Sequence, residues 1–412
     1  MTGTIAIPPR THLRSRTTGI VLVAAVLSVM TAPGQTAGLS VFTDPLIAEL
    51  GISRTGISLA YLLGTLTGAL AQPLVGRALD RWGVRRATIA IALFFASVLV
   101  GLSFAAEFIG LAAGYVGVRM AGQGALSLAA TTAVAHHVTH RRGLALGISS
   151  AIGSAGISLA PIGLERLIAS TDIHAAWRIE ALLVLLIVTP LAFLLPRRAP
   201  RHKKTGSEAP VTSATVWTTG AATRTGMFWV IAAALAAAGM LSTALAFHQV
   251  AVLADQGLSA TEAAANFLPQ TVTGLLTTLA IGALIDRYHP RLFLAGSMVT
   301  LAGALVMLPF VSPGWSAVAY GLVLGAAGGA LRGLEAAAYT RYYGTTHIGS
   351  IRGIAVGINL ASTAIGPIAL SIGHDLTGTF TVPAVVFATI PLAVAVAAVF
   401  VREPRLPAPP KS

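Results

Sequence analysis

A few ionisable side chains lie inside long apolar stretches of this sequence, where a charge is costly unless it faces a cavity or a partner. Arg119 lies within the apolar run 109–136, and Gln123 follows one helical turn later. Two interpretations are open. The guanidinium binds or orients an anionic solute, or it pairs with a carbonyl or an acid and only braces neighbouring helices.

Two further ionisable side chains lie in the apolar run 315–341. Arg332 and Glu335 are three residues apart there and would share one face of a helix. In one interpretation Glu335 takes up and releases a proton while Arg332 holds a solute. In the other, the two side chains form an ion pair near the cytoplasmic end of the helix.

His248 and several amides complete the candidate solute-binding set. The pKa of histidine is ordinarily close to neutral pH, so His248 could carry a proton, or it could be a hydrogen-bonded residue at the outer rim of a cavity. Gln35 adjoins the Pro33-Gly34 pair, and a helix break exposes backbone groups to a ligand. The full set is Gln35, Arg119, Gln123, His248, Gln270, Arg332, Glu335 and Asn359.

The elements that must position these residues are membrane-spanning helices. Of the 412 residues, 55% are apolar and only 10% are charged, and the mean hydropathy is +0.79. About 20 apolar residues span the hydrocarbon layer as a helix. The predicted fold is therefore an all-α integral membrane protein with twelve spans: 18–43, 55–78, 86–107, 109–136, 143–168, 176–196, 226–252, 262–284, 292–311, 315–341, 353–373 and 380–401.

The distribution of basic residues predicts the orientation. Most of the 27 Lys and Arg residues fall in alternate connections, which would be cytoplasmic, whereas acids favour the opposite connections. Both termini are then cytoplasmic, and the net charge of +13 reflects topology, not nucleic-acid binding. We expect a multi-pass protein of the bacterial inner membrane, in contact with lipid.

Several chemistries lack their sequence signals. The chain has no cysteine, and it contains neither a G-x-x-x-x-G-K-[ST] nor an H-E-x-x-H sequence. We expect no metal, no cofactor and no enzymatic activity, and ATP is not the evident energy source.

The sequence also contains an internal repeat. Gly76-Arg-Ala-Leu-Asp-Arg-Trp-Gly-Val-Arg-Arg follows the second predicted span, and a weaker copy beginning at Gly282 follows the eighth, about half a chain later. Parallel repeats of six helices are a known transporter plan. The predicted units are an N-terminal half (1–196), a cytoplasmic linker (197–225) and a C-terminal half (226–412).

The first copy, G-x-x-x-D-R-x-G-x-R-R, resembles the signature loop of the major facilitator superfamily. That resemblance implies alternating access by two rocking halves. It also implies gating contacts on the cytoplasmic side, between Asp80 and the region of Arg352 and between Asp286 and the region of Arg142. The arginines of the loop could equally serve only to fix orientation. The residues concerned are Gly76, Asp80, Arg81, Gly83, Arg85, Arg86, Gly282, Asp286, Arg287, Arg291, Arg142 and Arg352.

Shorter sequences are similar to the oxalate/formate antiporter-like and monocarboxylate porter branch. They are Gly34-Gln35, Phe42-Thr-Asp-Pro, Leu50-Gly-Ile-Ser-Arg-Thr, Arg119-Met-Ala-Gly-Gln-Gly and Gly349-Ser-Ile-Arg-Gly. Unlike the oxalate-type members, the spans 262–284 and 353–373 carry no basic residue between their ends.

A singly charged or uncharged solute therefore fits better than a dicarboxylate. We predict a monomeric secondary transporter of a small organic anion, a monocarboxylate as the best guess. Proton coupling through Glu335, Asp44 or His248 is a further hypothesis. The alternatives are a multidrug or hydrophobic-solute exporter of the same fold, and a non-transporting receptor or sensor.

Overall fold

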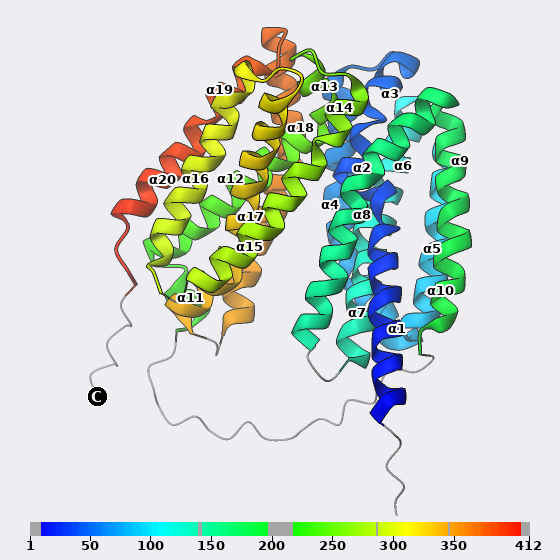
Figure 1. Ribbon diagram of the computed structural model, residues 1–412, viewed down its shortest axis with the longest axis horizontal. Coiled ribbons are helices and arrows are strands. Elements are labelled where there is room, and N and C mark those ends of the chain that lie inside the picture. Colours follow the sequence, from blue (N-terminus) through cyan, green and yellow to red (C-terminus); the bar gives the residue numbers. More distant parts are fainter. Residues whose placement is uncertain (1–9, 139–141, 197–216, 286, 345–346, 405–412) are drawn as a thin grey trace, which may run out of the picture.

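The computed structural model describes residues 10–138, 142–196, 217–285, 287–344 and 347–404, and within these ranges the secondary structure is helical. The helices form two groups that lie side by side (Figure 1). Each group has its own apolar core, one drawn from residues 217–398 and the other almost entirely from residues 23–195.

The first group contains the elements up to residue 194. They are α1 (Arg10–Val29), η1 (Ala32–Gly34), α2 (Thr36–Ser40), α3 (Thr43–Leu50), α4 (Arg54–Trp82), α5 (Val84–Leu102), α6 (Phe108–Val118), η2 (Arg119–Leu126), α7 (Ser127–His137), α8 (Arg142–Ser170), α9 (Ile173–Leu183), η3 (Val184–Val188) and α10 (Thr189–Leu194).

The second group begins after the short helix α11 (Thr219–Ala222). It comprises α12 (Gly226–Phe247), α13 (Gln249–Ala254), α14 (Ala260–Ala265), α15 (Phe267–Leu284), α16 (Pro290–Met307), η4 (Leu308–Phe310), α17 (Trp315–Tyr343), α18 (Ile348–Thr377), α19 (Thr381–Phe387) and α20 (Thr389–Phe400).

Among the described residues, ten helices are long and apolar enough to cross a membrane. The predicted spans 18–43 and 109–136 are not among them, because both are interrupted. In the first, the 3-10 turn η1 separates α1 from α2; in the second, the π-helical segment η2 separates α6 from α7. Twelve crossings and cytoplasmic termini stay predictions.

The interruption at η1 follows from its sequence. Pro33 has no N–H, so the carbonyl of Val29, four residues earlier, loses its helical donor. The amide of Gly34 turns instead to the carbonyl of Thr31, at 2.9 Å. A break of this kind persists at membrane depth only where the freed groups face protein or a cavity.

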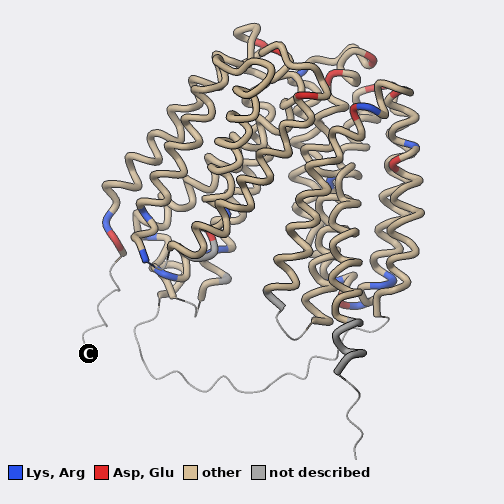
Figure 2. The backbone as a smooth tube through the Cα atoms, in the orientation of Figure 1, with Lys and Arg blue, Asp and Glu red and all other residues tan. Residues whose placement is uncertain are grey.

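Charge separates the two ends of the bundle. Among the described residues, most Lys and Arg lie at the end where α20 ends, and most Asp and Glu lie at the opposite end (Figure 2). The separation is the physical basis of the predicted orientation. Part of the predicted linker, residues 197–216, lies outside the described residues, as does Asp286.

Candidate functional site

Arg119 is enclosed at the junction of three elements of the first group. Its side chain is 3% exposed. Nε donates to Oγ1 of Thr65 at 3.1 Å, and Nη1 donates to the carbonyl of Gly34 at 3.1 Å and to Oγ1 of Thr36 at 3.4 Å. The guanidinium carbon lies 4.5 Å from the centre of the Tyr61 ring. A cation over an aromatic face is stabilised by the ring quadrupole.

No carboxylate pairs with Arg119 among the described residues. Its charge is held instead by hydroxyls, one carbonyl and an aromatic ring. The bracing interpretation is therefore correct in part, because Arg119 ties the break at η1 to helix α4.

Close backbone approach makes this arrangement feasible. A Cβ at Gly34 would lie 2.3 Å from the carbonyl oxygen of Val118 and 2.8 Å from Cα of Gly122. A Cβ at Gly122 would lie 2.7 Å from Cζ of Phe95 and 2.9 Å from Cα of Gly34. Only glycine at both positions lets η1 lie directly against η2. A π-helical segment inside an α-helix is frequent at functional sites.

A cavity of about 340 Å³ adjoins Arg119. Its lining contains no acidic residue and consists of Thr65, Gly68, Ala69, Gln72, Arg119, Gln123, Gly124, Ser127, Leu128, Thr131 and Leu360. Only Leu360 comes from the second group of helices, so the cavity faces the space between the groups. Its volume lies at the lower end of the range for small-molecule sites.

One nitrogen of Arg119 is available to that cavity. Among the described residues Nη2 donates to no hydrogen-bond acceptor, yet it is not among the enclosed, unpartnered polar atoms. Its two N–H groups therefore have no described acceptor, and Arg119 is part of the cavity lining. The predicted pairing of Arg119 with Gln123 in one site agrees with the cavity lining.

Sequence reasoning missed the helix α4 side of the cavity. Thr65, Gly68, Ala69 and Gln72 recur at spacings of three and four, which places them on one face of α4. Such a stripe of small and polar residues in an apolar span was the available signal. Gln72 lies over Gly124, where an added Cβ would meet its Nε2.

Glu335 pairs with Arg352, not with Arg332. Oε1 of Glu335 accepts from Nη2 of Arg352 at 3.0 Å, and both belong to the second group of helices. Arg332 is exposed and has no ion pair among the described residues; its guanidinium lies over Gly274 of α15. The alternative of an Arg332–Glu335 ion pair is therefore wrong here, because α18 brings Arg352 closer to the acid.

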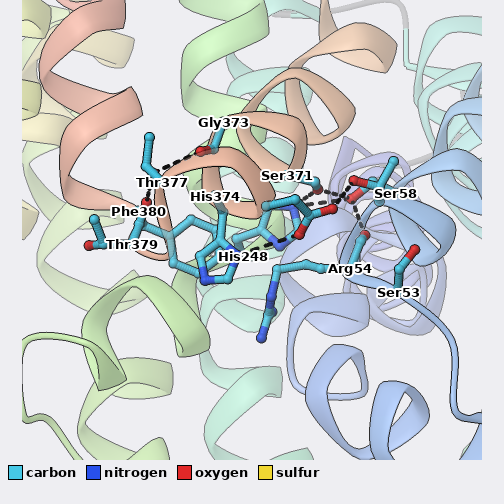
Figure 3. A network of polar contacts seen from close by, with 12 residues as sticks. Ser53, Arg54, Ser58, His248, Ser371, Gly373, His374, Thr377, Thr379 and Phe380 are labelled. Atoms are coloured by element: carbon cyan, nitrogen blue, oxygen red, sulfur yellow. Dashed lines mark hydrogen bonds and ion pairs between the residues drawn. The ribbon is translucent and has the colours of Figure 1, made fainter.

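His248 does not reach the cavity. It is 1% exposed and lies where the two groups of helices meet (Figure 3). Its Nε2 lies 3.2 Å from Oγ of Ser58, 3.0 Å from Oγ of Ser371 and 3.2 Å from the carbonyl of Pro367. The expected solvated histidine at a rim is instead a buried contact, because α4 and α18 close over it.

The remaining predicted amides lie apart from the Arg119 cavity. Nε2 of Gln35 donates to Thr31, within the break of the first span. Gln270 donates to Gln249 and Asn266 in the second group. Asn359 packs against Gly239 of α12.

Described residues form further hydrogen bonds between the two groups of helices. Thr55 donates to Asp375, and Thr261 donates to Glu165 at 2.6 Å. Ser158 bonds to Thr271. The contacts of Thr55 and Thr261 belong to the end that carries α3 and α13, opposite the end of α20 (Figure 1), whereas Ser158 lies near the middle of α8.

At the opposite end the gating residues that the structure describes do not meet across the groups; Asp286 lies outside the described residues. Asp80 is exposed and forms no ion pair among the described residues. Gly83 is a positive-φ residue, at 79°, which turns the chain from α4 into α5. Arg85 lies over the ring of Phe193 within its own group. The side chain of Arg142 lies outside the described residues.

The other residues of the two loops lie at the helix ends. Gly76, Gly282 and Arg291 are partly or fully exposed, as are Arg81, Arg86 and Arg287. None of them forms an ion pair in the described ranges.

The family of this chain is identified by comparison with a family model. The model described as Major Facilitator Superfamily matches residues 23–367. The chain belongs to this superfamily. It is a multi-pass membrane transporter whose superfamily carries small-molecule substrates, and the expectation from the loop after the second span is confirmed to that extent.

Solved structures show the same fold. A bacterial homologue of the human lysosomal transporter Spinster, inward-facing and unoccupied, matches with a TM-score of 0.69 at 15% identity, over 93% of this chain and 95% of the other. Its inward-facing, occupied form matches with a TM-score of 0.68 at 17% identity, over 96% of each chain. A sequence comparison with curated proteins finds no significant relative.

Proposed function

We propose that this major facilitator moves a small organic anion of the monocarboxylate type by secondary active transport. The observation that carries the proposal is the free Nη2 of Arg119 in a cavity without an acid. A guanidinium with two unused N–H groups is a strong partner for a carboxylate. Gln123 and Gln72 line the same cavity and supply further hydrogen-bond groups.

A single accessible guanidinium favours one carboxylate over two. The spans containing α15 and α18 add no basic residue to the cavity lining, in accord with a singly charged solute. The similarity of Arg119-Met-Ala-Gly-Gln-Gly to the oxalate/formate and monocarboxylate branch supports the same solute class.

Alternating access follows from where the two groups of helices meet. We infer that the end carrying α3 and α13 is extracytoplasmic, that both termini are cytoplasmic, and that residues 1–196 and 226–412 are the rocking halves. The structure then corresponds to an inward-facing state of a bacterial inner-membrane protein acting as a monomer. In the opposite state, Asp80 would approach the start of α18, and Arg352 would leave Glu335.

Uptake into proteoliposomes tests the proposal. Labelled formate, acetate, lactate, pyruvate and oxalate are supplied with and without an imposed pH gradient, and Arg119→Gln is compared with Arg166→Gln, an exposed arginine outside the cavity. We expect uptake of at least one monocarboxylate, lost in Arg119→Gln and kept in Arg166→Gln. Faster carboxylate uptake under an inwardly directed proton gradient would show that the transport is proton symport.

Two results would contradict the proposal. If no carboxylate enters the proteoliposomes, or if Arg119→Gln transports as well as the unaltered chain, the hypothesis of organic-anion transport is refuted. Transport of apolar dyes in place of carboxylates would favour the exporter alternative, and binding without any transport would favour a receptor.

A further inference from the structure

Glu180 is a buried acid that the transport site does not use. It lies in α9, about 10 Å along the helix from its first residue. Its position in the sequence suggests the outer face, yet the side chain is only 4% exposed. No Lys, Arg or His pairs with Glu180 anywhere in the described ranges.

The carboxyl group has no hydrogen-bond partner among the residues that the structure describes. Oε2 is fully enclosed and makes no hydrogen bond, and no described residue donates to Oε1. Burying an acid without a hydrogen bond or a counter-charge is strongly unfavourable, so such a group is kept where it has a ligand or a proton to bind.

Glu180 borders a second cavity, separate from the one at Arg119. The volume of this cavity is about 320 Å³. All of its other lining residues are apolar: Val29, Met30, Ala32, Pro33, Ala160, Gly163, Leu164, Leu167 and Leu183. They come from α1, η1, α8 and α9, so the cavity lies within the first group of helices.

Glu180 is the only lining residue with a polar side chain, and its carboxylate accepts hydrogen bonds. Val29, whose carbonyl receives no N–H from Pro33, also lines the cavity. A ligand that fits must therefore bring donors, and an ammonium group brings three N–H donors and the opposite charge.

The cavity opens to the side of the helix bundle. Gly163 and Leu183, on its border, are exposed, and Leu183 is 44% exposed. Exposed apolar residues of membrane-spanning helices face lipid, so a ligand that partitions into the bilayer could enter here. An amine with an apolar body has both the solubility and the charge for this route.

We propose that the cavity around Glu180 binds a lipophilic amine, with the ammonium group against the carboxylate and the apolar body between α1, α8 and α9. The proposal does not rest on the anion transport proposed above, because this cavity shares no lining residue with the Arg119 cavity.

Matched ligands and variants test the site in the full-length protein. Octylamine and octanol have the same chain and differ in the head group. The thermal stabilisation of the detergent-purified protein by each ligand is titrated, and the difference between protein variants removes the effect of partitioning into micelles. Glu180→Gln removes the charge at nearly constant shape.

A second pair of variants does not depend on Glu180. Gly163 lines the cavity, and a Cβ added there would meet no atom within 4 Å. The same is true of a Cβ at Gly147 of the same helix, which is not part of the lining. Gly163→Leu should therefore fill the cavity, and Gly147→Leu serves as its control.

The proposal expects octylamine to bind the unaltered chain at least tenfold more tightly than octanol, a difference of about 1.4 kcal/mol. Affinity for octylamine should fall by at least tenfold in Glu180→Gln and in Gly163→Leu, and persist in Gly147→Leu. Equal binding of octanol would overturn the amine assignment in favour of a neutral lipid. No saturable octylamine binding, or binding insensitive to Gly163→Leu, would overturn the site, leaving Glu180 as a proton site.

Discussion

Replacing Gly34 by alanine should disable the solute site through the backbone alone. The new Cβ would lie 2.3 Å from the carbonyl oxygen of Val118, whereas ordinary contact begins near 3.4 Å. Because the atoms it would meet at Val118 and Gly122 are backbone atoms, η1 would have to move away from the end of α6 and from η2 by about 1 Å. The bond from Nη1 of Arg119 to the carbonyl of residue 34, now 3.1 Å, would then exceed hydrogen-bonding distance.

The loss can be expressed as an affinity. A hydrogen bond to a charged group contributes about 1.5–3 kcal/mol, which corresponds to roughly ten- to hundredfold weaker binding if Arg119 reorients. The assay is calorimetric titration of purified protein with the carboxylate found in the uptake panel, with a thermal melt of each variant. Gly101→Ala is the control, since a Cβ at Gly101 meets nothing within 4 Å.

We expect Gly34→Ala to bind weakly and to melt at a lower temperature, and Gly101→Ala to retain affinity and to melt as before or slightly higher, because alanine is the better helix former. Unchanged affinity in Gly34→Ala would show that the contact between η1 and η2 does not position Arg119, and the reasoning from the two glycines would be refuted.

Three further predictions concern the gates. Ser371→Ala removes the hydroxyl that bonds to His248, so the contact between the two groups of helices should weaken by about 1 kcal/mol. A cysteine introduced next to His248 should then react roughly fivefold faster with a thiol reagent added at the end that carries α3 and α13. The chain has no cysteine of its own, so background labelling should be absent. Asp80→Asn should enrich the state seen here and slow transport, as measured by distances between spin labels at the α20 end; an unchanged distribution with full transport would exclude the gate. Glu335→Gln should lower the free energy of unfolding by about 1 kcal/mol or less, because the ion pair with Arg352 is partly exposed. A fall in melting temperature that corresponds to a larger loss would contradict this expectation.

Most of the fold was predictable because membrane-spanning helices are recognised from the length and the apolar composition of their sequences. The repeated loop sequence that begins at Gly76 also predicted the superfamily. Pro33-Gly34 correctly predicted the interruption of the first span. The π-helical segment η2 was not predictable, because no residue in Arg119–Leu126 forbids an ordinary α-helix. It depends on contacts with η1 and α4 that come from other parts of the chain.

The site was predictable only in part, for a related reason. Arg119 and Gln123 were found because polar residues stand out in an apolar run. Helical spacing predicted Arg332 as the partner of Glu335, but the partner is Arg352, because α17 packs against α18. The burial of Glu180 likewise depends on α1 and α8, which the local sequence does not describe.

The break at η1 contacts Arg119 on one side and lines the cavity of Glu180 on the other. Gly34 at its end holds Arg119 through its carbonyl, while Ala32 and Pro33 line the cavity of Glu180. A ligand that shifts this short segment on one side therefore changes binding on the other, and thermodynamic linkage requires the two effects to be equal in size. Whatever factor an amine imposes on carboxylate affinity, the carboxylate must impose on the amine.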